Sequence, residues 1–430
     1  MPNKTVTVGV VGLWHLGSVY SAGLIGMGYS VVAFDANKKV INNFKKGIPP
    51  IFEPGLTDAL EKYSDRISFS SAPSSLKNKD YIFITHDLEV DEHDVADVSV
   101  ISSLFALVAK QVNELTTIVI SSQIPVSTSR GLVSLLLKRG FKNPKVIYFP
   151  ENLRLGTAFD SFLKPDRIIL GSDNIEAIEQ FKKDFIFPCP YIAMGLESAE
   201  MVKHALNAYL ATCISLSCEL SDIAEKTGAD MFDVVKALHS DKRVSPYAPL
   251  LPGLGFAGGT LGRDIQSLSR IAKKYSYTPR LIQSVYSVNL ERVPGLVKKI
   301  QQELLVIKRK KIGILGLTYK PNTSTLRRSM SLDLASLLHK KGAKIIAFDP
   351  AVKETVDGYP YMRVATSVVD FASNLDIIVL MTDWKEFLEV DPSDLVKVMN
   401  CSVIIDTKNF LNKEQYKKSG FIYKGIGTKS

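Results

Sequence analysis

The stretch GLWHLG is the first in the chain whose residue types and spacing could do chemistry. Gly12 and Gly17 stand five positions apart, after an apolar run and before a helix-like run, which is the frame of a dinucleotide-binding turn. Gly12 would allow the tight turn, and Gly17 would allow the next helix to pack closely on the strand. Between them lie Trp14, His15 and Leu16, with Trp14 where a glycine usually lets the backbone approach a pyrophosphate. All five are candidate cofactor-binding residues.

Asp35 supplies the second feature that a dinucleotide site needs. It ends the next apolar run, eighteen residues after Gly17, where a carboxylate accepts from both ribose hydroxyls and repels a 2′-phosphate. NAD is therefore favoured over NADP, although Lys38 and Lys39 weaken the preference slightly. Two places remain open for the Trp14 side chain: turned away from the loop, or covering the pyrophosphate. The alternative to cofactor binding is a Rossmann-like domain without a ligand.

Two further stretches hold residue types that bind or catalyse. The run PENLRLGTAFDSFLKPDR contains Glu151, Arg154 and Lys164. Lys203 and Asn207 stand four positions apart in a helix-like run, so they share one helix face. Taken singly, each stretch has an ordinary explanation, surface ion pairs for the first and a solvated helix edge for the second.

A glycine-rich loop, PGLGFAGGTLGRD, is the third such stretch. It has five glycines in thirteen residues, among them Gly258, and it carries Thr260 and ends in Asp264. Alone it could be a flexible linker.

Short apolar strands that alternate with helical runs must position these residues. Near-continuous apolar strands of this kind are buried on both faces, as in a parallel sheet covered by helices. In the first half of the chain they are TVTVGVVG, SVVAFD, RISFS, DYIFITHD, TTIVISS and PKVIYFP, with helices expected in VSVISSLFALVAKQV and STSRGLVSLLLKRG. The pattern predicts a doubly wound α/β domain.

A proline-free run of some thirty residues follows, from about Gly195 to Gly228, and predicts one long central helix. The strand rhythm then returns in KKIGILGL, AKIIAFDP, LDIIVLMTDW and SVIIDTKN, where IGILGL and IIAFDP echo VGVVGL and VVAFDA. We therefore predict an α/β fold with two Rossmann-like, doubly wound parallel-sheet domains joined by the central helix and a helical middle domain. The expected domains are 1–195 and 301–430, which are Rossmann-like, and 196–300, which is helical.

Composition narrows the class of protein. The net charge of +9 is spread along the chain, which suits anionic small molecules better than nucleic acid, because a nucleic-acid footprint would be a concentrated basic stripe. No apolar run is long enough to span a membrane, and no secretory signal is visible. The four cysteines show no metal or disulfide spacing, so no metal site is expected and a reducing cytoplasm fits.

Taken together and in this order, the motifs resemble the UDP-glucose/GDP-mannose dehydrogenase family over nearly the whole chain. PENLRLG resembles that family's P-E-F-L-R-E-G, and AEMVKHALNAYLA resembles its central-helix motif. GLGFAGGTLGRD resembles its G-x-G-F-G-G-S-C-F-P-K-D, and YKPNTSTLRRS resembles its K-P-N-T-D-D-x-R-E-S. The resemblance implies an NAD-dependent dehydrogenase of polysaccharide biosynthesis. It implies that domain 1–195 binds NAD, that domain 196–300 forms a homodimer through the central helix, and that domain 301–430 binds the partner, a nucleotide sugar, with a UDP-sugar favoured.

By the same resemblance, Lys203, Asn207, Asp264, Glu151 and Thr260 take catalytic positions. Asp264, directly or through an ordered water, would accept the hydroxyl proton as hydride leaves for NAD, and Lys203 would stabilise the alkoxide. Positions for binding the substrate are, again by resemblance, Arg154, Lys164, Arg243, Gly258, Lys320 and Arg327.

Among the positions that depart from the family pattern, three bear on a second oxidation. Thr260 stands where the family has the cysteine that captures the intermediate aldehyde, Leu155 replaces the second glutamate of PEFLREG, and Gln123 replaces a threonine. Because a threonine hydroxyl is a poor nucleophile without a base, we predict a two-electron oxidation that stops at an aldehyde or ketone. Two alternatives remain: a four-electron UDP-sugar 6-dehydrogenase that forms a uronate, and an inactive regulatory protein that binds NAD and nucleotide sugar.

Overall fold

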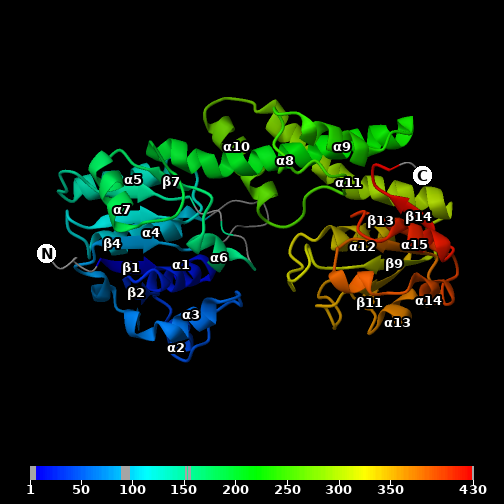
Figure 1. The fold of residues 1–430 in the computed structure, drawn as a ribbon, viewed down its shortest axis with the longest axis horizontal. Helices are drawn as coiled ribbons and strands as arrows, with labels where there is room; N and C mark the ends of the chain where they lie inside the picture. The colour runs from blue at the N-terminus through cyan, green and yellow to red at the C-terminus, as the bar shows by residue number, and fades with distance from the viewer. Residues whose placement is uncertain (1–5, 89–96, 151–152, 154–155, 429–430) are drawn as a thin grey trace. The chain divides into compact units, whose positions relative to one another are not determined.

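The computed structural model describes residues 6–88, 97–150, 153 and 156–428. The chain divides into two compact units, Met1–Leu206 and Asn207–Ser430. Each unit contains one sheet whose strands lie side by side with helices on its faces (Figure 1).

The sheet of the first unit has eight strands in the order β3-β2-β1-β4-β5-β6-β7-β8. The pairs from β3 to β6, and the pair β7–β8, are parallel, while β6 and β7 pair antiparallel. The strands are β1 (Thr7–Val11), β2 (Ser30–Phe34), β3 (Ile67–Ser70), β4 (Tyr81–Ile84), β5 (Thr117–Ile120), β6 (Val146–Tyr148), β7 (Ile168–Gly171) and β8 (Tyr191–Met194). The order reverses between β1 and β4, which is the point where ligands bind in open α/β sheets.

Alternate residues of these strands feed two separate cores, one on each face. In β4, Tyr81 and Phe83 pack with α1, α6 and α7, whereas Ile82 and Ile84 pack with α4 and α5. The helices of this unit are α1 (His15–Gly26), α2 (Lys38–Phe44), α3 (Leu56–Lys62), α4 (Val98–Ala109), α5 (Thr128–Lys138), α6 (Ala158–Leu163) and α7 (Ile175–Asp184). A strand buried on both faces is apolar throughout, which is why these runs lack the polar alternation of a half-exposed sheet.

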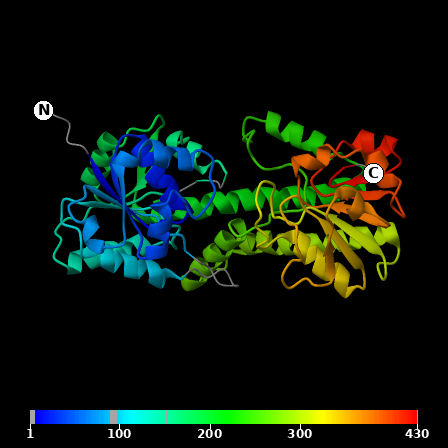
Figure 2. The same ribbon diagram turned by 90° about the horizontal axis from the view of Figure 1, so that it is seen from below.

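One helix of 32 residues, α8 (Leu196–Thr227), runs from the first unit into the second without a break (Figures 1 and 2). It ends before Gly228, whose φ of +78° is a left-handed conformation that glycine adopts easily. The predicted central helix is confirmed.

The sheet of the second unit has six parallel strands in the order β11-β10-β9-β12-β13-β14. The strands are β9 (Lys311–Leu315), β10 (Lys344–Phe348), β11 (Met362–Val364), β12 (Ile377–Leu380), β13 (Val403–Asp406) and β14 (Ile422–Gly425). The order reverses between β9 and β12, so this sheet repeats the arrangement of the first.

The helices of the second unit cover both faces of its sheet and build a helical layer on one side. They are α9 (Met231–Ser240), α10 (Leu261–Lys274), α11 (Arg280–Leu304), α12 (Met330–Lys340), α13 (Val368–Ala372), α14 (Pro392–Val396) and α15 (Lys413–Lys418). The second half of α11 buries Val293, Leu296 and Ile300 against the sheet. Its first half contributes Val285 to a small core with α8 and α10. One helix thus serves both layers.

The predicted α/β fold with two Rossmann-like sheets and a helical middle is confirmed. The strands β7, β8, β11 and β14 were not predicted, and the antiparallel β6–β7 pair departs from a fully parallel sheet. The division into domains 1–195, 196–300 and 301–430 stays a prediction.

Candidate functional site

The glycine turn of the first sheet follows β1 and opens α1. Gly12 has a φ of +93°, and a Cβ on Gly17 would lie 1.8 Å from the Gly12 carbonyl oxygen, so the turn needs glycine at both ends. Trp14 has a φ of −88°, which any residue adopts, and its side chain is 52% exposed. Leu16 points into the core. The missing second glycine therefore costs the turn no backbone strain.

Asp35 lies directly after β2 and holds the turn. Its Oδ2 accepts from the Leu13 amide at 2.9 Å, its Oδ1 accepts from the Asn37 amide at 2.8 Å, and its side chain stays partly exposed. A partly exposed carboxylate at this place fits the ribose of NAD.

The equivalent aspartate of the second sheet, Asp349, has a different environment. It is fully buried, and its Oδ2 accepts from the Leu317 amide at 2.7 Å, the Thr318 amide at 3.0 Å and the Trp384 indole at 3.1 Å. Because protein donors surround it, Asp349 is closed to a ribose. Of the two similar turns, only the one at Gly12 fits a dinucleotide.

Sequence reasoning missed Glu53, which joins this turn to the chain after residue 155. Glu53 is buried, and its Oε2 lies 3.2 Å from His15 Nε2 and 2.9 Å from the Gly156 amide, while its Oε1 accepts from the Ala158 amide at 2.7 Å. The candidates Glu151 and Arg154, and the departure Leu155, lie outside the described residues. Lys164 is exposed at the end of α6.

Glu200 on α8 anchors the loop after β5. It is fully buried and accepts from the Ser127 amide at 2.5 Å and the Ser129 amide at 2.7 Å, which caps the start of α5. Burial raises the pKa of the Glu200 carboxyl above its ordinary value, although the two amides favour the charged form. One turn further along α8 lies Lys203, which is 8% exposed.

Asn207 and Asp264 meet inside the second unit. The Asn207 side-chain amide donates to the Asp264 carboxylate, and both residues are buried. Asp264 lies in the first turn of α10, and its amide bonds to the carbonyl of Thr260 at 3.2 Å. Thr260 is exposed at the start of α10, and its hydroxyl makes no capping bond to that helix. The structure therefore brings three of the predicted catalytic residues into one small region.

A small cavity, called the pocket below, lies in the second unit at the carboxyl ends of its strands, where the strand order reverses. Thr318, Met381 and Lys408 line it from the segments after β9, β12 and β13, and Gly255 and Ala257 line it from the glycine-rich loop. This is where ligands bind in such sheets. Sequence reasoning missed Lys408, although its place after the apolar strand of SVIIDTKN was a usable signal.

The remaining substrate candidates differ in how they are connected to this pocket. Tyr319 lines the pocket, and the neighbouring Lys320 ammonium lies 5.6 Å from the centre of its ring. Gly258 bonds through its amide to the Arg328 carbonyl at 3.2 Å, and Arg327 is exposed beside it. Arg243 is 88% exposed and pairs with Asp241 at 2.6 Å, so no contact links it to the pocket among the described residues.

Comparison with known proteins identifies the three parts of the chain. The chain matches the UDP-glucose/GDP-mannose dehydrogenase family in its NAD binding domain (residues 6–185), its central domain (residues 197–291) and its UDP binding domain (residues 313–413). No helix among the described residues is long and apolar enough to cross a membrane.

Similar proteins and a similar solved structure support the same family. The chain is 31% identical to UDP-glucose 6-dehydrogenase TuaD of Bacillus subtilis, over 98% of this chain and 93% of that protein. It is also 31% identical to a UDP-glucose 6-dehydrogenase of Rickettsia conorii, over 97% of this chain and 99% of that protein. The structure resembles a UDP-glucose dehydrogenase from Pyrobaculum islandicum, with a TM-score of 0.87 and 26% identity over 100% of this chain and 99% of that one.

Proposed function

Because this chain belongs to the UDP-glucose/GDP-mannose dehydrogenase family, and is thus an NAD-dependent nucleotide-sugar dehydrogenase, we propose that it oxidises a carbinol of a UDP-sugar by two electrons. The similar proteins of Bacillus and Rickettsia act on UDP-glucose by name, which supports a UDP-sugar here.

The proposed residues divide the reaction between them. When bound, NAD supplies the hydride acceptor, and Gly12, Gly17 and Asp35 would hold it. Asp264 accepts the hydroxyl proton, and Asn207 orients that carboxylate through the hydrogen bond described above. Lys203 stabilises the alkoxide as negative charge develops on the substrate oxygen. The carbon loses its hydride, the oxygen loses its proton, and a carbonyl remains.

The observation that carries the two-electron proposal is that Thr260, a hydroxyl residue, lies one helical turn before Asp264, the carboxylate that pairs with Asn207. A second oxidation through covalent capture needs a thiolate, and a hydroxyl is a far weaker nucleophile. The buried Cys218 is bonded at the start of the glycine-rich loop, seven positions before Thr260, where its thiol donates to the Gly253 carbonyl oxygen at 3.5 Å.

The ratio of NADH formed to sugar consumed tests the proposal. Purified enzyme is mixed with NAD and a panel of UDP- and GDP-sugars, NADH is counted by absorbance, and the product is weighed by mass spectrometry. We expect one NADH per sugar and a product lighter by two hydrogen atoms. Two NADH per sugar with a uronate would show the four-electron reaction, and no NADH with any sugar would remove the enzyme proposal altogether.

We also propose a homodimer formed through α8. Tyr209, Leu216 and Ile223 are exposed apolar side chains seven positions apart, so they form one stripe along the helix. The resemblance gives the exposed Arg243 a role toward a neighbouring subunit's substrate. Leu216→Glu should convert the dimer to a monomer in sedimentation, whereas Leu137→Glu on α5, an equally exposed leucine, should not. A wild-type monomer at micromolar concentration would contradict the dimer.

A further inference from the structure

Asn409 stands out in the second unit because both its backbone and its side chain are strictly constrained. It follows Lys408, which lines the pocket, and its φ is +51°. Asparagine tolerates this left-handed conformation better than most residues, but a non-glycine residue held there still costs free energy unless other contacts fix it.

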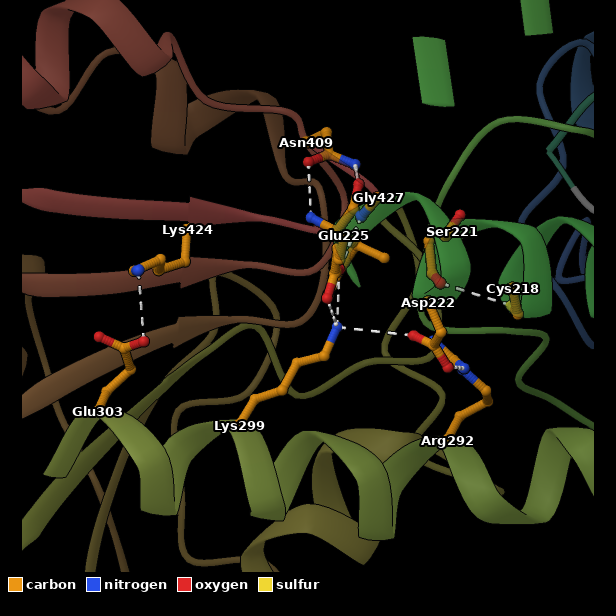
Figure 3. Close-up of polar contacts among 12 residues, drawn as sticks. Cys218, Ser221, Asp222, Glu225, Arg292, Lys299, Glu303, Asn409, Lys424 and Gly427 are labelled. Atoms are coloured by element: carbon orange, nitrogen blue, oxygen red, sulfur yellow. Dashed lines mark hydrogen bonds and ion pairs between the residues drawn. The ribbon is translucent and has the colours of Figure 1, made fainter. Parts of the chain in front are cut away.

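The contacts that fix Asn409 come from its side-chain amide. Its Nδ2 donates to the Ile426 carbonyl oxygen at 3.0 Å and to the Pro252 carbonyl oxygen at 3.3 Å, and its Oδ1 accepts from the Ile426 amide at 3.0 Å. Figure 3 shows the side chain reaching down to the segment that leaves β14. One side chain thus bonds the turn after β13, the exit of β14 and the start of the glycine-rich loop.

Pro252 is the residue where the glycine-rich loop begins, and three elements hold that loop in place. Cys218 of α8 donates to the Gly253 carbonyl oxygen at 3.5 Å. Asn289 of α11 accepts from the Phe256 amide at 2.8 Å and donates to the Phe256 carbonyl oxygen at 3.0 Å. Asn409 supplies the third tether. The glycine-rich loop is therefore held in place where it lines the pocket.

The other end of the Asn409 tether is anchored by charged residues. Glu225 of α8 accepts from the Gly427 amide at 2.8 Å, and Lys299 of α11 lies 2.7 Å from Glu225 and 3.7 Å from Asp222. The buried Arg292 pairs with Asp222 at 2.5 Å (Figure 3). Ile426, next to Gly427, is consequently a rigid support for Asn409.

Lys408 is fixed from the same turn. Its amide donates to Asp406 Oδ1 at 2.9 Å, and the other Asp406 oxygen accepts from the Tyr423 hydroxyl at 2.7 Å. Asn409 therefore joins the turn that carries Lys408 to Pro252, the first residue of the glycine-rich loop.

We propose that Asn409 is a positioning residue for the nucleotide-sugar pocket, which sets Lys408 and the glycine-rich loop at a fixed separation so that both contact the bound nucleotide. The inference rests on the proposed function, because it assumes that the pocket takes the nucleotide sugar. It predicts that loss of the Asn409 amide weakens nucleotide-sugar binding while NAD binding, which depends on residues of the first unit, is unchanged.

Asn409→Gly tests the amide alone, because glycine keeps the left-handed backbone and removes only the side chain. Asn409→Asp keeps the acceptor for the Ile426 amide but places a carboxylate against two carbonyl oxygens. The matched control is Asn374→Gly, since Asn374 is also left-handed (φ +57°) and exposed in the same unit but does not line the pocket. Each variant is compared with wild type for KM and kcat, for NAD and UDP affinity by calorimetry, and for melting temperature.

We expect both Asn409 variants to raise the nucleotide-sugar KM and the UDP dissociation constant by about tenfold, as loss of one or two hydrogen bonds would. NAD affinity should stay within about twofold, and Asn374→Gly should match wild type in both ligands. If Asn409→Gly binds UDP as tightly as wild type, the positioning role is overturned, whether or not the melting temperature changes. If Asn409→Gly does not fold, Asn409→Asp decides by the same criterion. Wild-type protein that neither binds UDP nor oxidises any nucleotide sugar would instead overturn the proposed function.

Discussion

Asn207 of α8 donates its side-chain amide to the Asp264 carboxylate of α10, and neither residue is exposed to solvent by more than 6%. The contact fixes the first turn of α10 against α8, and Thr260 lies one turn before Asp264 at the exposed start of the same helix. A buried carboxylate oriented by a side-chain amide is well suited to accept a proton in a fixed direction.

The first prediction concerns that carboxylate. Asp264→Asn preserves the shape of the side chain but removes the proposed proton acceptor, so kcat should fall by about 10²- to 10⁴-fold. NAD affinity should not change. Asn207→Ala keeps the acceptor and removes only its orienting donor, so its loss of kcat should be smaller. The measurement is NADH formation at saturating NAD and sugar, and an Asp264→Asn enzyme that keeps a tenth of the wild-type kcat would contradict the assignment.

The second prediction compares the two aspartates that end equivalent strands. Asp35→Asn should weaken NAD binding by about tenfold, because a charged acceptor to the ribose hydroxyls is replaced by a neutral one. Asp349→Asn should leave NAD affinity unchanged but lower the free energy of unfolding by about 1–3 kcal/mol, since an amide NH₂ would then face buried donors. Calorimetric titration with NAD and urea unfolding measure the two effects. Equal losses of NAD affinity in both variants would show that the burial of Asp349 does not prevent its turn from binding NAD.

The contrast between Asp35 and Asp349 also shows the limit of sequence reasoning. Both follow an Ala-Phe pair at the end of a strand, and the sequence alone marks them as equivalent. Only Asp349 has Trp384 donating to it, from a position 35 residues later. Local pattern predicted the strand, the turn and the carboxylate, but a contact between distant segments decides whether that carboxylate is available.

The same reason explains which elements and residues were missed. Long apolar runs such as β4 and the proline-free α8 were predictable because their periodicity is local. The short strands β11 and β14 are defined by pairing with β10 and β13, which no local pattern encodes. Asn409, whose side chain bonds Pro252, has the composition of an ordinary turn residue. Its importance comes from a contact across 157 positions of sequence.

The third prediction concerns the effect of the Trp14 side chain on NAD binding. Its side chain is half exposed, and its carbonyl oxygen accepts from the Ser18 amide at 3.0 Å as part of α1. Because the φ of Trp14 requires no glycine and the residue is half exposed, we expect Trp14→Gly to leave NAD affinity within about twofold of wild type. Gly17→Ala is the contrasting variant, because its Cβ would overlap the Gly12 carbonyl oxygen and NAD binding should be lost. A change of more than about tenfold in Trp14→Gly would place the indole over the pyrophosphate.

The fourth prediction restores a thiol to the glycine-rich loop. Thr260→Cys places a cysteine at the exposed start of α10, where the helix dipole stabilises a thiolate. If the missing sulfur is what stops the reaction after one hydride transfer, the variant should capture the aldehyde, and the yield should rise from one NADH per sugar toward two. Thr260→Ser and Thr260→Ala should both remain at one. Since Cys189, Cys213 and Cys401 are also at least partly exposed, alkylation of the variant is compared with that of wild type to identify the new thiol. A Thr260→Cys enzyme whose aldehyde still leaves unchanged would show that the departures at Gln123 and Leu155, rather than Thr260, limit the second step.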